Sequence, residues 1–217
     1  MSDFAVARQN MVLGQLEPSQ VTDPSVTEAM ASVPREAFVP SHLAGVAYVD
    51  EDLEIAPGRY VIEPVVLARM LQAADIKPGD LVLDIGCGTG YSTAVLARLA
   101  ATVVALENES DLAARATETL ARLAVDNAAV VTGPLALGMA AQGPYDVIVL
   151  QGAIPDLPAA LGEQLADDGR LVAVTGSGGA GKATLFGCHD GVISGAVLFD
   201  AAIPPLPGFE QPDEFIF

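Results

Sequence analysis

Short apolar runs alternate with amphipathic segments over the C-terminal two thirds of the chain. The runs rich in Val, Ile and Leu predict strands at 81–85, 102–106, 128–132, 145–150 and 170–175. Apolar residues recur at helical spacing between them, at 91–100, 110–124 and 158–166. Strands that alternate with helices predict a mostly parallel sheet covered on both faces.

The two ends of the chain follow other patterns. Residues 182–188 and 192–199 flank Asp190-Gly191, a strong signal for an antiparallel hairpin. Residues 203–217 are rich in proline and acid, and we expect an extended tail on the surface, anchored by Phe209, Phe215 or Phe217. The first 76 residues predict helices at 3–16, 24–32 and 63–74.

A glycine-rich turn directly follows the first predicted strand. Asp84 ends an apolar run, Gly86, Gly88 and Gly90 follow at alternate positions, and a helical pattern begins at Tyr91. This order places a nucleotide-like ligand against a helix N-terminus, and glycines allow close approach of the backbone. A dinucleotide fingerprint would need glycine where Tyr91 stands, which disfavours a nicotinamide enzyme.

Two acids favour S-adenosylmethionine as the ligand. Asp84, which stands before the turn, suits a ligand with an ammonium group and no phosphate. Glu107 ends the next predicted strand, where an acid is placed to bind ribose hydroxyls. The D-x-G-x-G-x-G pattern resembles motif I of the class I methyltransferases.

Composition narrows the remaining possibilities. With 28 acidic and 10 basic residues the 217-residue chain has a net charge of −18, which argues against a nucleic-acid partner. The apolar runs are shorter than the ~18 residues of a membrane span, and no secretory signal is visible. The cysteines (Cys87, Cys188) and histidines (His42, His189) form no metal-binding pattern. We therefore expect a cytoplasmic monomer without metal.

Several longer strings point to one family. They are Arg8-Gln-Asn-Met-Val, Val33-Pro-Arg-Glu-Ala-Phe-Val-Pro40 and Ala47-Tyr-Val-Asp50, followed by 77–91, 144–148 and 161–172. Together they resemble protein-L-isoaspartate O-methyltransferases over nearly the whole chain. The resemblance implies a three-layer, Rossmann-like class I methyltransferase fold in a single domain. We expect a helical cap and substrate loop at 1–76, a cofactor-binding core at 77–200 and a tail at 201–217.

The same resemblance implies a reaction and a cofactor site. A methyl group would pass from S-adenosylmethionine to the carboxylate of an isoaspartyl residue in a protein or peptide, the first step of protein repair. A carboxylate is ionised at pH 7, so the transfer needs no general base. We expect the cofactor to be bound by Asp84, Gly86, Cys87, Gly88, Gly90, Tyr91, Glu107, Asn108, Thr132, Gly133 and Leu150.

The substrate loop departs from the family pattern. The family has Thr-Ile-Ser-Gln-Pro where this chain has Tyr60-Val-Ile62-Glu63-Pro. Ile62 replaces the Ser whose hydroxyl lies at the substrate carboxylate, and Glu63 replaces the Gln. We take Tyr60, Ile62 and Glu63 as the candidate catalytic positions and expect weak isoaspartyl activity. A methyltransferase for another small acceptor and a non-catalytic S-adenosylmethionine-binding module remain open. The loop predicted after residue 150, Gln-Gly-Ala, also differs from the family's Thr-Ala-Ala.

Overall fold

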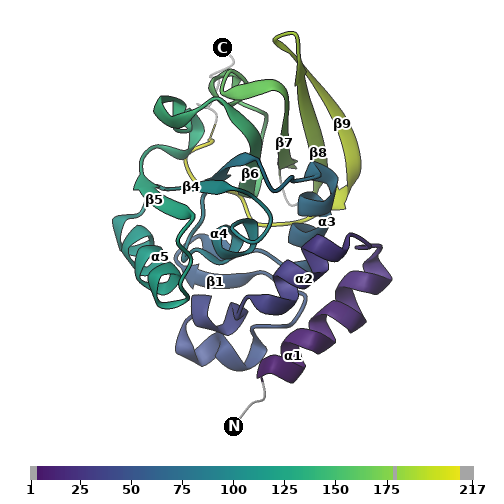
Figure 1. The fold of residues 1–217 in the computed structure, drawn as a ribbon, viewed down its shortest axis with the longest axis vertical. Coiled ribbons are helices and arrows are strands. Elements are labelled where there is room, and N and C mark those ends of the chain that lie inside the picture. The colour runs from purple at the N-terminus through teal and green to yellow at the C-terminus, as the bar shows by residue number, and fades with distance from the viewer. Residues whose placement is uncertain (1–3, 178–179, 211–217) are drawn as a thin grey trace, which may run out of the picture.

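A seven-stranded sheet forms the centre of the protein (Figure 1). The computed structural model describes residues 4–177 and 180–210. Along the sheet the strands lie in the order β5 (Ala128–Thr132), β4 (Thr102–Glu107), β3 (Leu81–Ile85), β6 (Tyr145–Ile154), β7 (Leu165–Ser177), β8 (Ala180–His189) and β9 (Val192–Ala201). The first five pair in parallel, and β8 and β9 are antiparallel. The predicted α/β fold with a C-terminal hairpin is confirmed.

Six α-helices surround the sheet in the described part of the chain. They are α1 (Phe4–Met11), α2 (Pro24–Ser32), α3 (Pro64–Ala74), α4 (Tyr91–Leu96), α5 (Ser110–Arg122) and α6 (Ala159–Gly162). Three predicted helices were too long: residues 12–16 form a π-helical turn, α4 ends at Leu96, and β7 begins soon after α6. Among residues 4–177 and 180–210, no helix is long and apolar enough to cross a bilayer.

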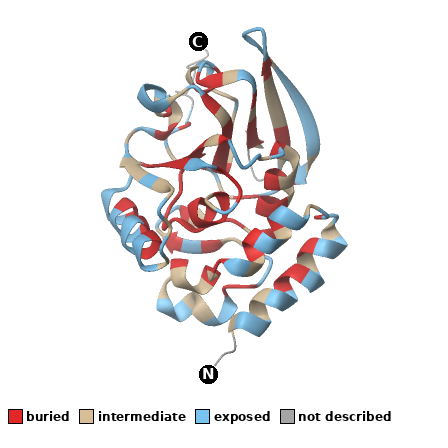
Figure 2. Ribbon diagram, viewed as in Figure 1, coloured by how far each residue is buried: buried red, intermediate tan, exposed pale blue. Residues whose placement is uncertain are grey.

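Alternate residues of the parallel strands face two different cores. Val82, Val103 and Val147 point toward the side covered by α1–α4. Leu83, Leu106 and Ile148 point to the other side, where α6 and the C-terminal segment pack. Each set is fully buried, which explains why these strands read as continuous apolar runs (Figure 2).

A second sheet has only two short strands, β1 (Leu53–Ala56) and β2 (Arg59–Val61). The two-residue connection places Gly58 at φ +69°, a conformation that favours glycine. Alternation along the hairpin buries Ile55 and Arg59, while Tyr60 stays half-buried. This hairpin was not predicted, and its buried side lies against the glycine turn.

Residues 203–209 are extended, as expected, with Pro205 and Gly208 exposed and the predicted anchor Phe209 buried, but Ile203 and Leu206 also pack into the fold. Ile203, Leu206 and Phe209 are each at most 7% exposed. Leu206 N–H donates to the Ala153 carbonyl at 2.8 Å, and Ala153 N–H donates to the Pro204 carbonyl at 2.9 Å. The segment (yellow in Figure 1) therefore runs beside the end of β6. The predicted anchors Phe215 and Phe217 lie outside the described residues.

Candidate functional site

The glycine turn connects β3 to α4 with three left-handed glycines. Gly86, Gly88 and Gly90 have φ values of +78°, +57° and +94°. A Cβ on Gly86 would lie 2.6 Å from Leu206, and one on Gly88 would lie 2.7 Å from Ile55. The turn has the predicted backbone form, but side chains of this chain itself lie directly against it.

Asp84 lies at the carboxyl end of β3 and is fully buried. It accepts hydrogen bonds from the Ser92 and Thr93 hydroxyls at 2.7 and 2.6 Å, and from the Gln151 amide at 2.8 Å. Burial raises its pKa to about 6, although these three hydrogen bonds act in the opposite direction. These three donors leave about one of the four lone-pair sites of the carboxylate for a further donor such as an ammonium group.

Glu107 at the end of β4 is also fully buried and engaged. The Arg59 guanidinium contacts it through two nitrogens, at 2.5 and 2.7 Å. Main-chain N–H groups of Gly88, Asn108 and Glu109 donate at 2.7, 2.9 and 3.0 Å. A carboxylate has about four lone-pair sites. Five donors therefore saturate the acid that was expected to bind ribose hydroxyls.

The other predicted cofactor residues separate into two groups. Asn108 accepts from Arg59 at 2.8 Å, and Gly133 N–H donates to the Glu107 carbonyl, so Asn108, Thr132 and Gly133 lie beside Glu107 at the strand ends. Three others turn toward the interior: Cys87, whose pKa burial raises, Leu150, and Tyr91, whose ring packs on Phe38 and Arg35. Gly90 faces Ala116 of α5.

The three candidate catalytic positions lie on β2 and the residues before α3. Ile62 is only 2% exposed and contributes to the core. Glu63 is half-buried, and burial together with the carboxylates of Asp52 and Asp50 raises its pKa to about 7. Arg59 cannot compensate its charge because it is engaged by Glu107.

A small cavity lies where these groups meet. Its lining residues are Tyr60, Val61, Ile62, Leu67, Gly86, Cys87, Tyr91, Ser92 and Gln151, and its volume is about 10 Å³. That is room for about one water molecule, whereas small-molecule sites are typically ~300–1,000 Å³. The donors and acceptors have the expected chemistry, but S-adenosylmethionine does not fit this cavity as the side chains lie here.

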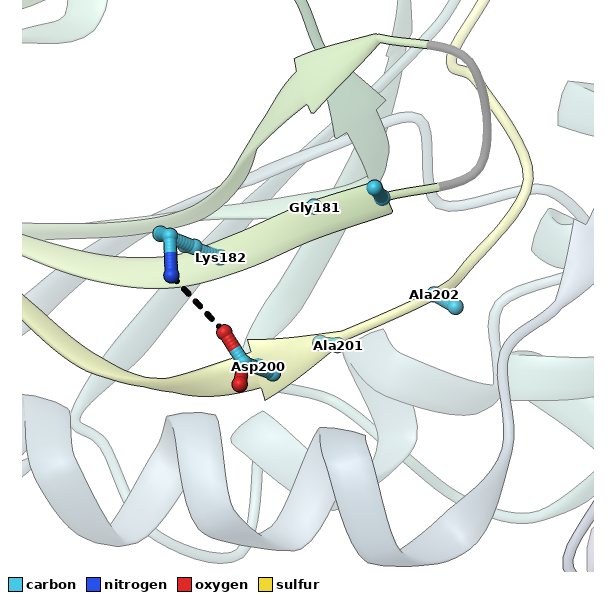
Figure 3. Close-up of a pocket in the computed structure, with 6 residues that line it drawn as sticks. Gly181, Lys182, Asp200, Ala201 and Ala202 are labelled. Carbon is cyan, nitrogen blue, oxygen red and sulfur yellow. Dashed lines mark hydrogen bonds and ion pairs between the residues drawn. The ribbon is translucent and has the colours of Figure 1, made fainter.

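Two features away from this cavity gather polar side chains. A hollow of about 330 Å³ opens beside the start of β8 and the end of β9. Two of its lining residues, Lys182 and Asp200, form an ion pair at 2.9 Å (Figure 3). Asp167, Asp168 and His189 place ligand atoms within 4.8 Å of one another, but all three are exposed. Neither feature contains a buried polar group directed at a ligand.

The parallel sheet, the glycine turn after β3 and the acid at the end of β4 define a class I methyltransferase domain. Comparison with known proteins assigns the family. The family model for protein-L-isoaspartate (D-aspartate) O-methyltransferase matches residues 7–196. The chain belongs to this family, and the predicted class, an S-adenosylmethionine-dependent methyltransferase, is confirmed at that level.

Curated relatives carry the same family name. The chain is 44% identical over 177 residues to the protein-L-isoaspartate O-methyltransferase of Koribacter versatilis, covering 82% of this chain and 80% of that protein. It is 43% identical over 169 residues to that of Methanoculleus marisnigri, covering 78% and 77%.

Solved structures support the fold. One protein-L-isoaspartate O-methyltransferase superposes with a TM-score of 0.82 at 24% identity, over 93% of this chain and 67% of that one. A Plasmodium falciparum protein described as such a methyltransferase, in complex with S-adenosyl-L-homocysteine, gives 0.80 at 22% identity, over 93% and 98%.

Three residues that the sequence did not assign to the site contact the glycine turn or Asp84. Arg59 belongs to none of the motifs in the sequence, and Gln151 stands there only as a departure from the family pattern. Leu206 was assigned to a surface tail. No local pattern connects these residues to the glycine turn, because all three reach it from elements distant in sequence.

Proposed function

We propose that the protein methylates the free α-carboxylate of isoaspartyl residues in peptides or proteins, with S-adenosylmethionine as the methyl donor. Family membership over residues 7–196 supports this assignment. The acceptor is an ionised carboxylate at pH 7, so the protein's task is to position it and exclude water.

Two residues of the substrate loop, Ile62 and Glu63, are poorly suited to a carboxylate substrate. Ile62 offers no hydroxyl, and Glu63 has a pKa of about 7 beside Asp50 and Asp52. Two carboxylates within ~4 Å repel by about 4 kcal/mol at an effective dielectric constant of 20. Turnover of an isoaspartyl peptide should therefore be slow at pH 8 and should rise as Glu63 is protonated below pH 7.

A methyl-transfer assay with a radiolabelled donor tests this. We expect the double variant Ile62→Ser, Glu63→Gln to methylate an isoaspartyl peptide at least tenfold faster than wild type at pH 8. Glu63→Gln alone should flatten the rise toward low pH. The same peptide with normal aspartate is the control substrate. Fast wild-type turnover that is independent of pH between 6 and 8 would show that this loop does not limit the reaction.

We further propose that the chain acts as a single-domain monomer in the cytoplasm. Two free cysteines, Cys87 and Cys188, are both buried and unbridged, which suits a reducing compartment. Light scattering coupled to size-exclusion chromatography should give a mass near 22.2 kDa. A mass of twice that value would contradict the monomer.

A further inference from the structure

A buried arginine occupies the position at which the cofactor's ribose is expected. Arg59 is 3% exposed and points from β2 onto the glycine turn. Besides its two contacts to Glu107, it donates to the Gly86 carbonyl at 3.1 Å and to the Asn108 side chain at 2.8 Å. We propose that Arg59 competes with the cofactor for Glu107 and thereby sets the cofactor affinity. This inference rests on the proposed use of S-adenosylmethionine.

The competition is unequal while Arg59 stays in place. Hydrogen bonds from a guanidinium to a carboxylate are roughly twice as strong as neutral ones, and this pair is bidentate. Ribose hydroxyls are neutral donors, so their hydrogen bonds to Glu107 would be weaker than those of Arg59. Cofactor binding therefore requires that the guanidinium leave the carboxylate first.

The hairpin that carries Arg59 is built in a way that allows this movement. β1 and β2 pair only with each other and form no ladder with the central sheet among the described residues. Ile55 of β1 lies against Gly88, and Leu206 lies against Gly86 and Gly152. Lifting the hairpin breaks side-chain contacts, the Arg59 bonds and the bonds that Arg35 donates to the Val61 and Ile62 carbonyls at 3.4 and 3.0 Å. The seven-stranded sheet stays intact.

A closed form of this kind lowers the apparent affinity by a predictable factor. The apparent dissociation constant equals the intrinsic one divided by the fraction of molecules that are open. Weakening the hold of Arg59 on Glu107 should raise that fraction. It should also expose Cys87, which is 4% exposed and lines the small cavity under β2.

Two measurements on the full chain test the inference. The first is the affinity for S-adenosyl-L-homocysteine by calorimetry. The second, without ligand, is the rate at which an alkylating reagent modifies Cys87, located by mass spectrometry. We expect Arg59→Gln to tighten binding and to accelerate Cys87 labelling, each by about tenfold or more and by similar factors. Arg98→Gln, at an exposed position in the turn after α4, is the matched control and should change neither.

Arg59→Lys keeps the charge but loses the bidentate contact, so it should tighten binding and accelerate Cys87 labelling by a smaller factor than Arg59→Gln. It serves as the test variant if Arg59→Gln unfolds. Circular dichroism melting identifies folded variants. A folded Arg59 variant that binds more weakly would show that Arg59 helps to bind the cofactor, and would overturn the inference. If wild type binds and Arg59→Gln binds no more tightly, the inference alone fails. If no form binds at millimolar ligand, the proposed function fails with it.

Discussion

Protonation of Glu63 should make the stability of the folded protein depend on pH. The pKa of Glu63 is raised from 4.5 to about 7 by burial and by the carboxylates of Asp52 and Asp50. A raised pKa means that the folded protein holds a proton which the unfolded chain has released, so stability falls as pH rises from about 4.5 to 7. At 1.36 kcal/mol per unit the full shift corresponds to about 3 kcal/mol. Because the side chain is only half-buried, solvent screening reduces this to about 1–2 kcal/mol.

Glu63→Gln removes this titration and leaves Asp52 and Asp84 to titrate in both proteins. Urea denaturation measures the difference in unfolding free energy between the variant and wild type. We expect this difference to shift in favour of the variant by about 1–2 kcal/mol between pH 4.5 and pH 8. The exposed Glu28→Gln, on α2, is the control and should give the same difference at both pH values. An equal effect of Glu63→Gln at pH 4.5 and pH 8 would refute the assigned role of its neighbours.

Three further substitutions test contacts around the site, and the free energy of unfolding of each variant is measured by urea denaturation. Gly90→Ala should lose about 2 kcal/mol, because φ is +94° and the new Cβ would lie 3.2 Å from Ala116; a loss below 0.5 kcal/mol would contradict this. Gln164→Ala should lose about 2–3 kcal/mol, since its buried amide bonds three main-chain groups, and an unchanged midpoint would argue against it. Arg170→Met removes an ion pair with Asp80 at 2.7 Å and should cost about 1–2 kcal/mol, less in 1 M salt; a loss independent of salt would exclude the ion pair as its cause.

Local pattern predicted the parallel core because its signals repeat at short range. Val/Ile/Leu runs marked β3, β4 and β6, and the glycines at 86–90 marked the turn between β3 and α4. Asp190-Gly191 marked the β8–β9 hairpin, with Gly191 at φ +74°. In each case the residues that fix the conformation lie within a few positions of one another.

The residues that close the site could not be predicted in this way. β2 has three residues and includes a charged one, which an apolar pattern does not select. Arg59 meets Glu107 across 48 positions. β6 extends through Gln151 to Ile154, a region that was expected to be a loop. Ala153 there pairs both with β7 and with the chain near residue 205. Such contacts depend on how the elements pack in three dimensions.

The order of synthesis gives Leu206 a further significance. Gly86 and Gly152 are made well before Leu206, which packs on both of them. A ribosome-bound chain can therefore assemble β3 to β6 while the glycine turn is still open on that side. Synthesis of the segment around Leu206, rather than formation of strands β3 to β6, is the event that covers the turn on that side.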